Sequence, residues 1–530
     1  MTTAFREACL RHPAVVVFAA GLLVPLAYAP WRLFFIFFLA YAVFFSLSWR
    51  AHRHGGRLFL LGWAFAFGQL LSGLYWLGHA FLVDAEQFLW LLPFAVTLLP
   101  AGLALFAGAS VWLWGKVWGA VCRHRDLAAH PLAGRLTGKM AAFLLLAFFW
   151  SAGEVARSHL LTGFPWNLPA MVFGSWVYAA QPIAWVGIHG LGLMALIVAA
   201  LIAYPAWRVR LAGLLLIVAV FGLGAARVAV LETTAAATGE PVLLVQPNIN
   251  QKEKWDPARQ ADVIAAMFAQ TARAVGAHPE ARLVVWPEAA LPLYLDEGTA
   301  FTDRLRASVP PQTILLTGAV RRQVNGGAIN YFNSVMVWSG SGTLIARRDK
   351  THLVPFGEYL PLQNLLEAMG FRQLTQMRGG YTPGHDTSPI ALPDGRRLHP
   401  LICYEAIFPY RARTSPRPDM LVNLTNDGWF GRSAGPHQHL GLTRLRAVEQ
   451  GLPLVRVANT GISVMVDALG RPMARIELDT RGAIAVPLPA ALPPTGFSVF
   501  GHVPFAIFWF LGVGFLCFWR GRNKLILGDQ

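Results

Sequence analysis

The sequence has few cysteines and few charged residues. It has four cysteines in 530 residues, which is too few for a disulfide framework. Charged residues make up 14% of the chain and hydrophobic residues 55%, and the mean hydropathy is +0.46. A typical soluble domain has about 25% charged residues. These shortages argue against a small disulfide-stabilised domain and an ordinary soluble enzyme, and they indicate a protein that crosses a membrane several times.

Long apolar runs are absent from one large part of the chain, between Glu232 and Pro494, where charged residues, Pro and Gly return. Elsewhere, runs of about 16 to 26 residues are long enough to cross a hydrocarbon core of about 30 Å as helices. Eight spans are predicted, at residues 14–29, 32–48, 58–82, 89–114, 140–156, 186–206, 211–230 and 499–519. The sequence therefore predicts a polytopic α-helical membrane protein with an inserted soluble domain. Its parts are a seven-helix bundle (1–231), the soluble domain (232–495), and a last helix with its tail (496–530).

Acidic residues are also scarce, with 28 Asp and Glu against 44 Lys and Arg. Lys and Arg are retained in the cytoplasmic loops of membrane proteins. One set of loops and tails contains Arg6, Arg11, Arg50, Arg53, Arg57, Lys116, Arg123, Arg125, Arg135, Lys139, Arg208, Arg210, Arg520, Arg522 and Lys524. The alternate set contains only Arg32, Arg157 and Arg227, beside the acidic "VDAEQ" loop. This bias predicts cytoplasmic termini and an extracytoplasmic soluble domain. It disfavours nucleic-acid binding, because the basic residues flank spans and form no continuous stripe.

The first span ends in "LAYA", which resembles a signal-peptidase site. We expect this span to remain uncleaved, because Pro30 follows the candidate site and a second span begins at once.

The soluble domain alternates short β-branched runs with helical patterns. Strands are predicted at "PVLLVQPNI", "ARLVVWPEAALP", "TILLTGAV", "NSVMVWS", "HPLICYEA", "DMLVNLTND", "PLVRVAN" and "GISVMVDA". Helices are predicted at "ADVIAAMFAQTARAVG" and "HQHLGLTRLRAVEQG". Continuous apolar strands interleaved with helices indicate an α/β domain whose sheets are covered by helices.

Three polar residues stand at or near strand ends, where α/β folds place their chemistry. Glu288 follows "VVWP", Lys350 lies in "RRDKTHLVPFGEYLP", and Cys403 ends "PLIC". Each alone also fits a structural role as a loop acid, a surface cation or a buried small hydrophobe. Cys403, however, is the only cysteine of a domain predicted to lie outside the cytoplasm, where cysteines normally pair. It is therefore either inert and buried or retained for reactivity, which requires a base and a nearby cation.

Other candidate residues have simpler explanations. His437 and His439 in "GPHQHL" lack a convincing third metal ligand, so we expect them to cap and pack, and we expect no metal or cofactor. "TNDGWFG" reads as a turn. Glu154, Arg157 and His159 close the fifth span near its outer end, where ionisable groups are functional candidates or simply lie at the interface.

The motifs "WPEAALP", "KTHLVPFGEYLP" and "LICYEAIFP", in this order, resemble the nitrilase superfamily. The match covers residues 241–487 and implies an αββα sandwich with a Glu-Lys-Cys triad. By this resemblance Glu288 is the general base, Lys350 stabilises the oxyanion and Cys403 is the acylated nucleophile. The amide N–H of the next residue is a natural second oxyanion donor.

The resemblance also implies supporting residues. Glu358, in "PFGEY", corresponds to the second glutamate of the superfamily, which holds the lysine in place. The remaining matches are Asn333 and Glu405 at active-site positions, Tyr404 beside the nucleophile, and Trp255, in "NINQKEKWD", at a substrate-contacting position.

With membrane spans on both sides of these motifs, the whole chain resembles the apolipoprotein N-acyltransferase family of bacterial inner-membrane enzymes. The resemblance implies transfer of an acyl chain from a phospholipid, through a cysteine thioester, to a diacylglyceryl apolipoprotein, on the periplasmic face. We expect a monomer with no nucleic-acid partner. The segment "PLQNLLEAMGFRQLTQM" is a candidate lid, with a helix packed on the domain as its alternative. Two other functions remain open. A membrane-anchored nitrilase or amidase would need only one span, and a non-catalytic receptor or transporter would need no triad.

Overall fold

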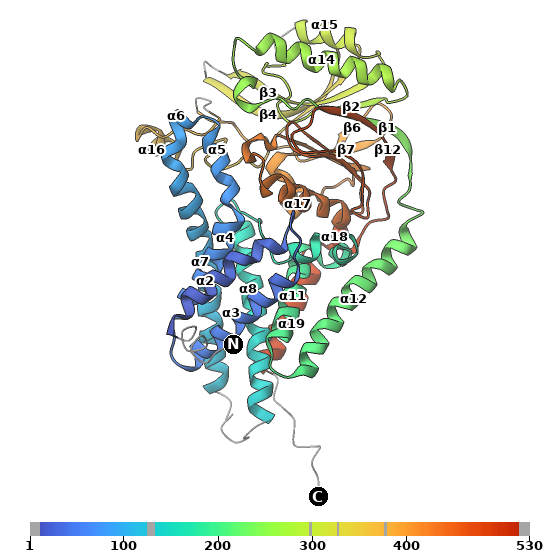
Figure 1. Cartoon of the computed structure of the whole chain (residues 1–530). Helices are drawn as coiled ribbons and strands as arrows, with labels where there is room; N and C mark the ends of the chain where they lie inside the picture. Colours follow the sequence, from blue (N-terminus) through green and yellow to red (C-terminus); the bar gives the residue numbers. More distant parts are fainter. Residues whose placement is uncertain (1–10, 124–132, 296–298, 326–327, 376–378, 519–530) are drawn as a thin grey trace, which may run out of the picture.

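The computed structural model describes residues 11–123, 133–295, 299–325, 328–375 and 379–518. A helical bundle forms one end of the molecule and two β-sheets with their covering helices form the other (Figure 1). The bundle contains α2 (Pro13–Leu23), η1 (Val24–Ala27), α3 (Phe35–Arg53), α4 (Leu58–Gly73), η2 (Tyr75–Leu77), α5 (Gly78–Leu82), α6 (Ala85–Phe88), η3 (Leu89–Leu91), α7 (Leu92–Arg123), α8 (Ala133–His159), α9 (Met171–Gly174), α10 (Val177–Ala180), α11 (Ile183–Ala203), α12 (Trp207–Leu231), α18 (Gly496–Phe500) and α19 (Val503–Phe518).

The prediction of a helical membrane region is confirmed. Within the described residues, five helices are long and apolar enough to cross a membrane, or six if α4 and the bent segment Tyr75–Leu82 count as one span. The first and last predicted spans fall on shorter apolar helices, Pro13–Ala27 and Val503–Cys517.

Aromatic side chains and small residues hold the bundle together. The rings of Phe44 and Phe65 stack at a centroid distance of 4.6 Å, and Trp150 meets Phe44 edge-on at 5.0 Å. Helices α2 and α4 approach closely because Gly21 and Gly68 face each other's helix, and a Cβ at either position would collide with the opposing backbone. Such small-residue contacts are typical of helix packing in lipid, where the hydrophobic effect does not drive association.

The inserted segment forms two six-stranded sheets. The first has the order β12-β1-β2-β3-β4-β5 and the second β11-β10-β9-β8-β7-β6. The strands are β1 (Ala237–Gln246), β2 (Leu283–Val285), β3 (Ile314–Asn325), β4 (Ala328–Ser339), β5 (Leu344–Asp349), β6 (Ile390–Ala391), β7 (Arg397–Ile402), β8 (Met420–Thr425), β9 (Leu454–Ala458), β10 (Ser463–Val466), β11 (Pro472–Ile476) and β12 (Gly482–Pro489). The helices are α13 (Gln251–Lys254), α14 (Gln260–Ala277), α15 (Thr299–Ser308), α16 (Gln363–Ala368), η5 (Cys403–Ile407), η6 (Pro409–Arg411), η7 (Asp427–Phe430) and α17 (Ala434–Gln450).

The sheets and helices stack in four layers. Apolar side chains from the two sheets, such as Val285 and Val422, share one buried core. Helices α14 and α15 cover the outer face of the first sheet, and α17 covers the outer face of the second (Figure 1). This arrangement confirms the predicted αββα sandwich.

Helix α17 is also the layer that meets the bundle. Leu442, Leu445 and Val448 belong to the same hydrophobic core as the membrane helices. Polar contacts add to this interface: the Glu449 carboxylate accepts a hydrogen bond from the backbone N–H of Ile188 on α11 at 3.1 Å. The sandwich is therefore packed onto the bundle and not merely tethered to it.

Candidate active site

The structure brings Glu288, Lys350 and Cys403 together from three separate loops. Glu288 follows β2, Lys350 follows β5, and Cys403 follows β7. Lys350 Nζ lies 3.7 Å from Glu288 Oε1, and the charges of both residues act on the Cys403 thiol. The three residues are only 7%, 1% and 8% exposed in chain order. A base, a cation and a thiol thus share one buried site.

Glu358 and Asn333 hold Glu288 and Lys350 in place through direct contacts. Lys350 Nζ lies 2.9 Å from Glu358 Oε2, and Asn333 Nδ2 donates to both Glu288 Oε1 at 2.7 Å and Glu358 Oε1 at 2.9 Å. The backbone N–H of Val354 donates to Glu358 Oε2 at 2.8 Å. Both predicted supporting residues therefore touch the triad directly.

Burial and charge set the protonation of these groups. Burial raises the pKa of Glu288, with Lys350 partly opposing it. Burial alone would lower the pKa of Lys350, but Glu358 and Glu288 outweigh it and raise that pKa. Burial and the Glu288 charge raise the pKa of Cys403, so the thiol is protonated at neutral pH. Lys350 is thus a fixed cation, and the thiol needs a base before it can attack.

Cys403 sits in an unusual backbone turn. It opens the 3₁₀ helix η5 with φ of 49°, a left-handed conformation that is uncommon outside glycine. Glu405 holds this turn: its Oε2 accepts from the N–H of Ile402 at 2.9 Å. Its Oε1 accepts from Thr351 N at 2.8 Å, Thr351 Oγ1 at 2.8 Å and His352 N at 3.0 Å. Glu405 therefore ties the loop after Lys350 to the turn at Cys403.

Tyr404 and Trp255 have different surroundings. Tyr404 is buried, and its hydroxyl donates to the carbonyl of Gly163, in the loop between α8 and α9, at 3.0 Å. Its side chain thus binds the sandwich to the bundle. Trp255 is 42% exposed at the end of α13, next to Lys254, whose Nζ approaches the carbonyl oxygen of Glu288 at 3.5 Å.

Two residues near the triad were not identified from the sequence. Lys254 is 1% exposed, and burial lowers its pKa to about 8. In "QKEKWD" it stands among other charged residues, and no sequence signal distinguishes it. His439, expected only to cap and pack, lies with Nε2 3.2 Å from the carbonyl oxygen of Cys403. No group of His, Cys, Asp and Glu within the described residues is arranged to hold a metal ion.

Two of the ionisable residues at the end of α8 form a buried pair. Arg157 and Glu154 are buried and paired with each other, and Arg157 Nη1 also donates to the carbonyl of Phe164. His159 is exposed. The pair fixes the loop that carries Gly163, the partner of Tyr404.

A buried glutamate, lysine and cysteine on an αββα sandwich define a nitrilase-type domain, here mounted on a membrane bundle. Residues 242–492 match the carbon-nitrogen hydrolase family, and residues 20–201 match the apolipoprotein N-acyltransferase N-terminal domain. The chain is 37% identical to the apolipoprotein N-acyltransferase of Rhodopseudomonas palustris, over 93% of this chain and 92% of that protein. It is 38% identical to the enzyme of the same name from Bradyrhizobium diazoefficiens, over 94% of each chain. The chain belongs to the apolipoprotein N-acyltransferase family, a family of acyltransferases with a carbon-nitrogen hydrolase fold.

Among solved structures, a carbon-nitrogen hydrolase from Helicobacter pylori G27 aligns with 47% of this chain and 88% of its own. The TM-score is 0.37 and the identity 18%, too low to bear on activity.

Proposed function

We propose that the protein transfers an acyl chain from a membrane phospholipid to the N-terminal amine of S-diacylglyceryl-cysteine apolipoproteins, through a thioester on Cys403. The observation that carries this proposal is the buried Glu288, Lys350 and Cys403 cluster in a sandwich packed on a membrane bundle. Membership of the whole chain in the acyltransferase family supports it further.

In the first half-reaction Glu288 takes the Cys403 proton and the sulfur attacks the ester carbonyl of the phospholipid. Lys350 and the N–H of Tyr404 stabilise the oxyanion. The C–O bond then breaks, Glu288 returns the proton to the departing alkoxide, and lysophospholipid leaves. A thioester remains on Cys403.

In the second half-reaction the α-amine of the acceptor attacks the thioester carbonyl. Glu288 accepts a proton from the amine, the C–S bond breaks, and the Cys403 sulfur regains a proton. An amide forms from a thioester, so the step is downhill. Its efficiency depends on keeping water from the thioester.

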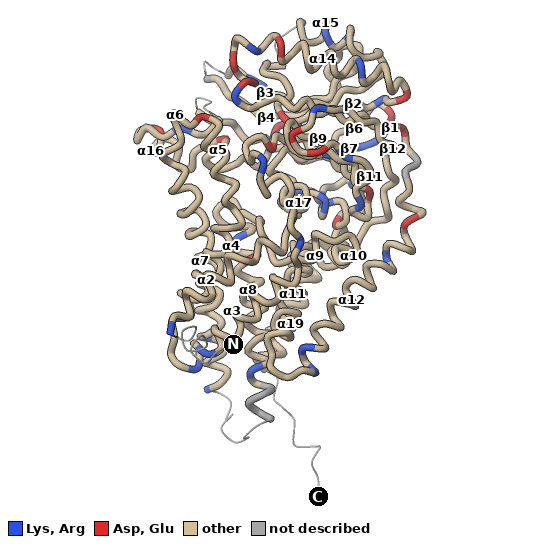
Figure 2. The backbone as a smooth tube through the Cα atoms, viewed as in Figure 1, with Lys and Arg blue, Asp and Glu red and all other residues tan. Residues whose placement is uncertain are grey.

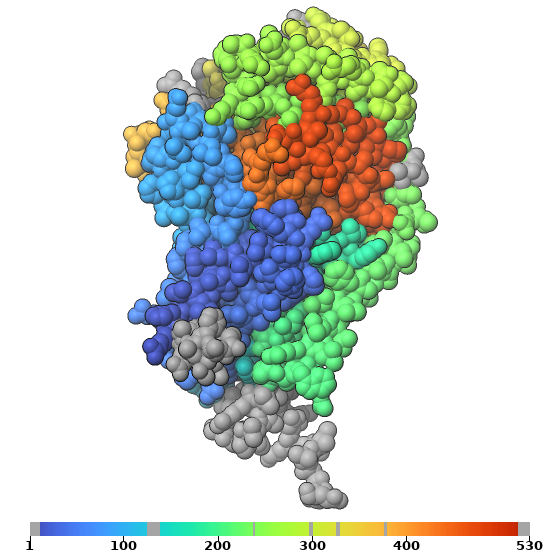
Figure 3. Space-filling model, in the orientation of Figure 1, coloured from blue at the N-terminus to red at the C-terminus, as the bar shows by residue number. Residues whose placement is uncertain are grey.

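Apolar residues around the site support a lipid substrate. The candidate lid contains α16, and its Leu362, Leu365 and Met369 are exposed. The ring of Phe371 lies 5.9 Å from that of Trp90 in the bundle, and α16 protrudes beside α6 (Figures 1 and 3). We propose that this segment, which includes residues 376–377 outside the described part, covers lipid chains at the membrane surface. We also propose that the exposed Trp255 contacts substrate.

The lid proposal is tested by limited proteolysis with and without phospholipid vesicles. A lid predicts that cleavage within the segment changes when lipid is present. Equal protection in both states would instead indicate a helix packed permanently on the domain.

The distribution of charge supports the proposed orientation. Lys and Arg gather at the end of the bundle far from the sheets (Figure 2), where Arg50 and Arg53 end α3 and Arg208 and Arg210 begin α12. The family and the apolar helices point to the bacterial inner membrane. We propose that the basic end and both termini are cytoplasmic and the sandwich is periplasmic. Because one chain supplies the whole triad, we also propose a working monomer.

The decisive experiment is an intact-mass measurement. Purified full-length protein in detergent is incubated with a phospholipid and no acceptor, then with a diacylglyceryl peptide. The proposal predicts one added acyl group, which disappears in Cys403→Ala, persists in the matched control Cys122→Ala, and moves to the peptide. An unmodified wild-type protein that hydrolyses small amides would favour the anchored amidase. Native mass spectra of the same samples test the monomer.

A further inference from the structure

The carbonyl group of Cys403 is held by two buried side chains. His439 Nε2 donates to this oxygen at 3.2 Å, since a carbonyl can only accept, and Asn423 Nδ2 approaches it at 3.4 Å. His439 lies on α17 and Asn423 on β8, and both are fully buried. Both side chains thus contact Cys403, the residue whose backbone is in the left-handed conformation.

These two side chains are themselves fixed by a buried ion pair. His439 Nδ1 lies 2.9 Å from Asp427 Oδ1, and Arg456 Nη2 donates to Asp427 Oδ2 at 2.6 Å. Arg456 also donates to the Asn423 side-chain oxygen, and Thr425 Oγ1 donates to Asp427 Oδ1 at 2.9 Å. Burial raises the pKa of Asp427, but Arg456 and His439 outweigh it and lower the pKa to about 2, so the carboxylate is charged.

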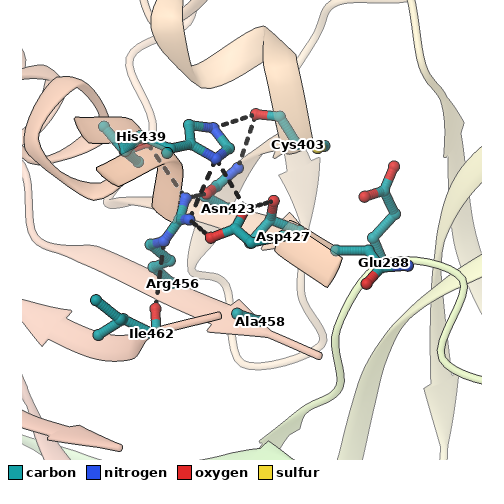
Figure 4. Close-up of polar contacts among 12 residues, drawn as sticks. Glu288, Cys403, Asn423, Asp427, His439, Arg456, Ala458 and Ile462 are labelled. Atoms are coloured by element: carbon teal, nitrogen blue, oxygen red, sulfur yellow. Dashed lines mark hydrogen bonds and ion pairs between the residues drawn. The ribbon is translucent and has the colours of Figure 1, made fainter. Parts of the chain in front are cut away.

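The network lies on one side of the nucleophile and the base on the other. In Figure 4 the Cys403 carbonyl points toward His439 and Asn423, whereas Glu288 lies across from them on the side of the sulfur. His439 and Asn423 contact the Cys403 carbonyl and not its sulfur, so their hold acts through the Cys403 backbone. The Asp427 charge also acts on the thiol, whose pKa it raises.

The peptide plane transmits that effect. In a trans peptide the C=O of one residue and the N–H of the next point in opposite directions. Fixing the Cys403 carbonyl against His439 thus directs the Tyr404 N–H to the opposite side. Tyr404 is in the first turn of η5, where helix geometry leaves N–H groups without an intrahelical acceptor.

We propose that Asp427, His439, Arg456 and Asn423 form a positioning network that holds the Cys403–Tyr404 peptide in the orientation needed for the oxyanion. His439 is its central member, because it joins the ion pair to the carbonyl. Without its N–H the peptide can rotate, and the Tyr404 donor moves away from the developing charge. The inference rests on the proposed thioester chemistry of Cys403.

The test compares two reactions of the same thiol. p-Nitrophenyl butyrate acylates Cys403 through an oxyanion, and the burst of nitrophenolate gives the acylation rate. Iodoacetamide alkylates the thiol without forming an oxyanion, and intact mass gives that rate. Both are measured on full-length protein in detergent as wild type, His439→Leu and His439→Gln. Leucine removes the donor at similar volume, and glutamine restores an N–H at the same reach.

We expect His439→Leu to slow acylation by about 10- to 100-fold, as displacement of a catalytic group does. The KM and the alkylation rate should change little, and His439→Gln should recover most of the loss. Parallel loss of acylation and alkylation, or a glutamine variant as slow as leucine, would overturn the inference. So would an unchanged acylation rate in His439→Leu.

Should the leucine variant fail to fold, Asp427→Asn carries the test. It keeps the shape of the side chain but loosens the hold on His439. We expect slower acylation, whereas alkylation should stay the same or become faster, because the Asp427 charge that raises the thiol pKa is gone. Acylation as fast as in wild type, or a parallel loss of both reactions, would refute the network. A parallel reaction with phospholipid separates the positioning network from the proposed lipid donor. If wild type reacts with the small ester but never with phospholipid, the proposed lipid donor is wrong and the positioning network is unaffected.

Discussion

Glu405 gives the most direct test of how the active-site loops are held. Its carboxylate accepts four hydrogen bonds, three on Oε1 from Thr351 and His352 and one on Oε2 from Ile402. In Glu405→Gln one of the two oxygens becomes an NH₂ donor. The more favourable orientation of the glutamine leaves the amide oxygen facing Thr351 and His352 and turns the NH₂ toward the Ile402 N–H. The hydrogen bond from Ile402 is then lost and two donors face each other. The other three hydrogen bonds remain, but their acceptor is no longer charged.

The expected effect follows from these contacts. A hydrogen bond to a charged group contributes about 1.5–3 kcal/mol, and an unpaired buried donor adds to its loss. We expect Glu405→Gln to lower the free energy of unfolding by about 3–5 kcal/mol, which is the range for breaking a buried charged contact. A shift of the Lys350 loop by about 1 Å would slow acylation by about 100-fold.

The assay is thermal unfolding of the detergent-solubilised protein together with the phospholipid acylation rate of Cys403. Asp303→Asn is the matched control, because Asp303 lies on α15, is exposed and accepts a hydrogen bond from Arg306 Nη1 at 2.8 Å. The control should match wild type in both measurements. The reasoning is refuted if Glu405→Gln unfolds and acylates as the control does.

Three further predictions concern single side chains. Because burial raises the pKa of Glu288, acylation should decline with falling pH at a higher pH than an ordinary glutamate would cause. Asn333→Ala removes a donor that stabilises the Glu288 carboxylate and should move this decline to still higher pH. Identical pH profiles of acylation for wild type and Asn333→Ala would contradict this prediction. Burial lowers the pKa of Lys254 to about 8, so the folded protein loses this proton at a lower pH than the unfolded chain does. The free energy of unfolding of wild type should therefore rise relative to that of Lys254→Met as the pH increases from about 8 to 10. Unfolding measured at several pH values checks this prediction. Tyr404→Phe removes the hydroxyl that donates to the Gly163 carbonyl at 3.0 Å, and it should destabilise the protein by about 1–3 kcal/mol in thermal unfolding. Acylation should be retained because the backbone N–H remains.

The sequence predicts the local pattern of the fold better than its long-range contacts. Buried strands such as β8 are continuous apolar runs, and α14 and α17 show helical spacing, so all three were predicted. The edge strands β11 and β12 were not predicted, because "PMARI" and "GAIAVPLP" contain proline, which edge positions tolerate.

In the candidate site, too, local motifs were predicted and long-range contacts were not. Motif resemblance identified Glu288, Lys350 and Cys403, and their meeting in space depends on three loops far apart in the chain. His439 lies 36 residues from Cys403, and nothing in its local sequence indicates a contact with that carbonyl. Lys254 was missed because its burial depends on the packing of α13 near Glu288.

Helix α17 has two buried faces, one against the second sheet and one against the membrane helices. A fragment containing only the sandwich would expose Leu442, Leu445 and Val448 to water, and such an apolar patch favours aggregation. It would also leave Tyr404 without Gly163. Inhibitor screening therefore needs the full-length chain in detergent or a lipid nanodisc, because the isolated sandwich lacks the bundle contacts that hold α17 and Tyr404.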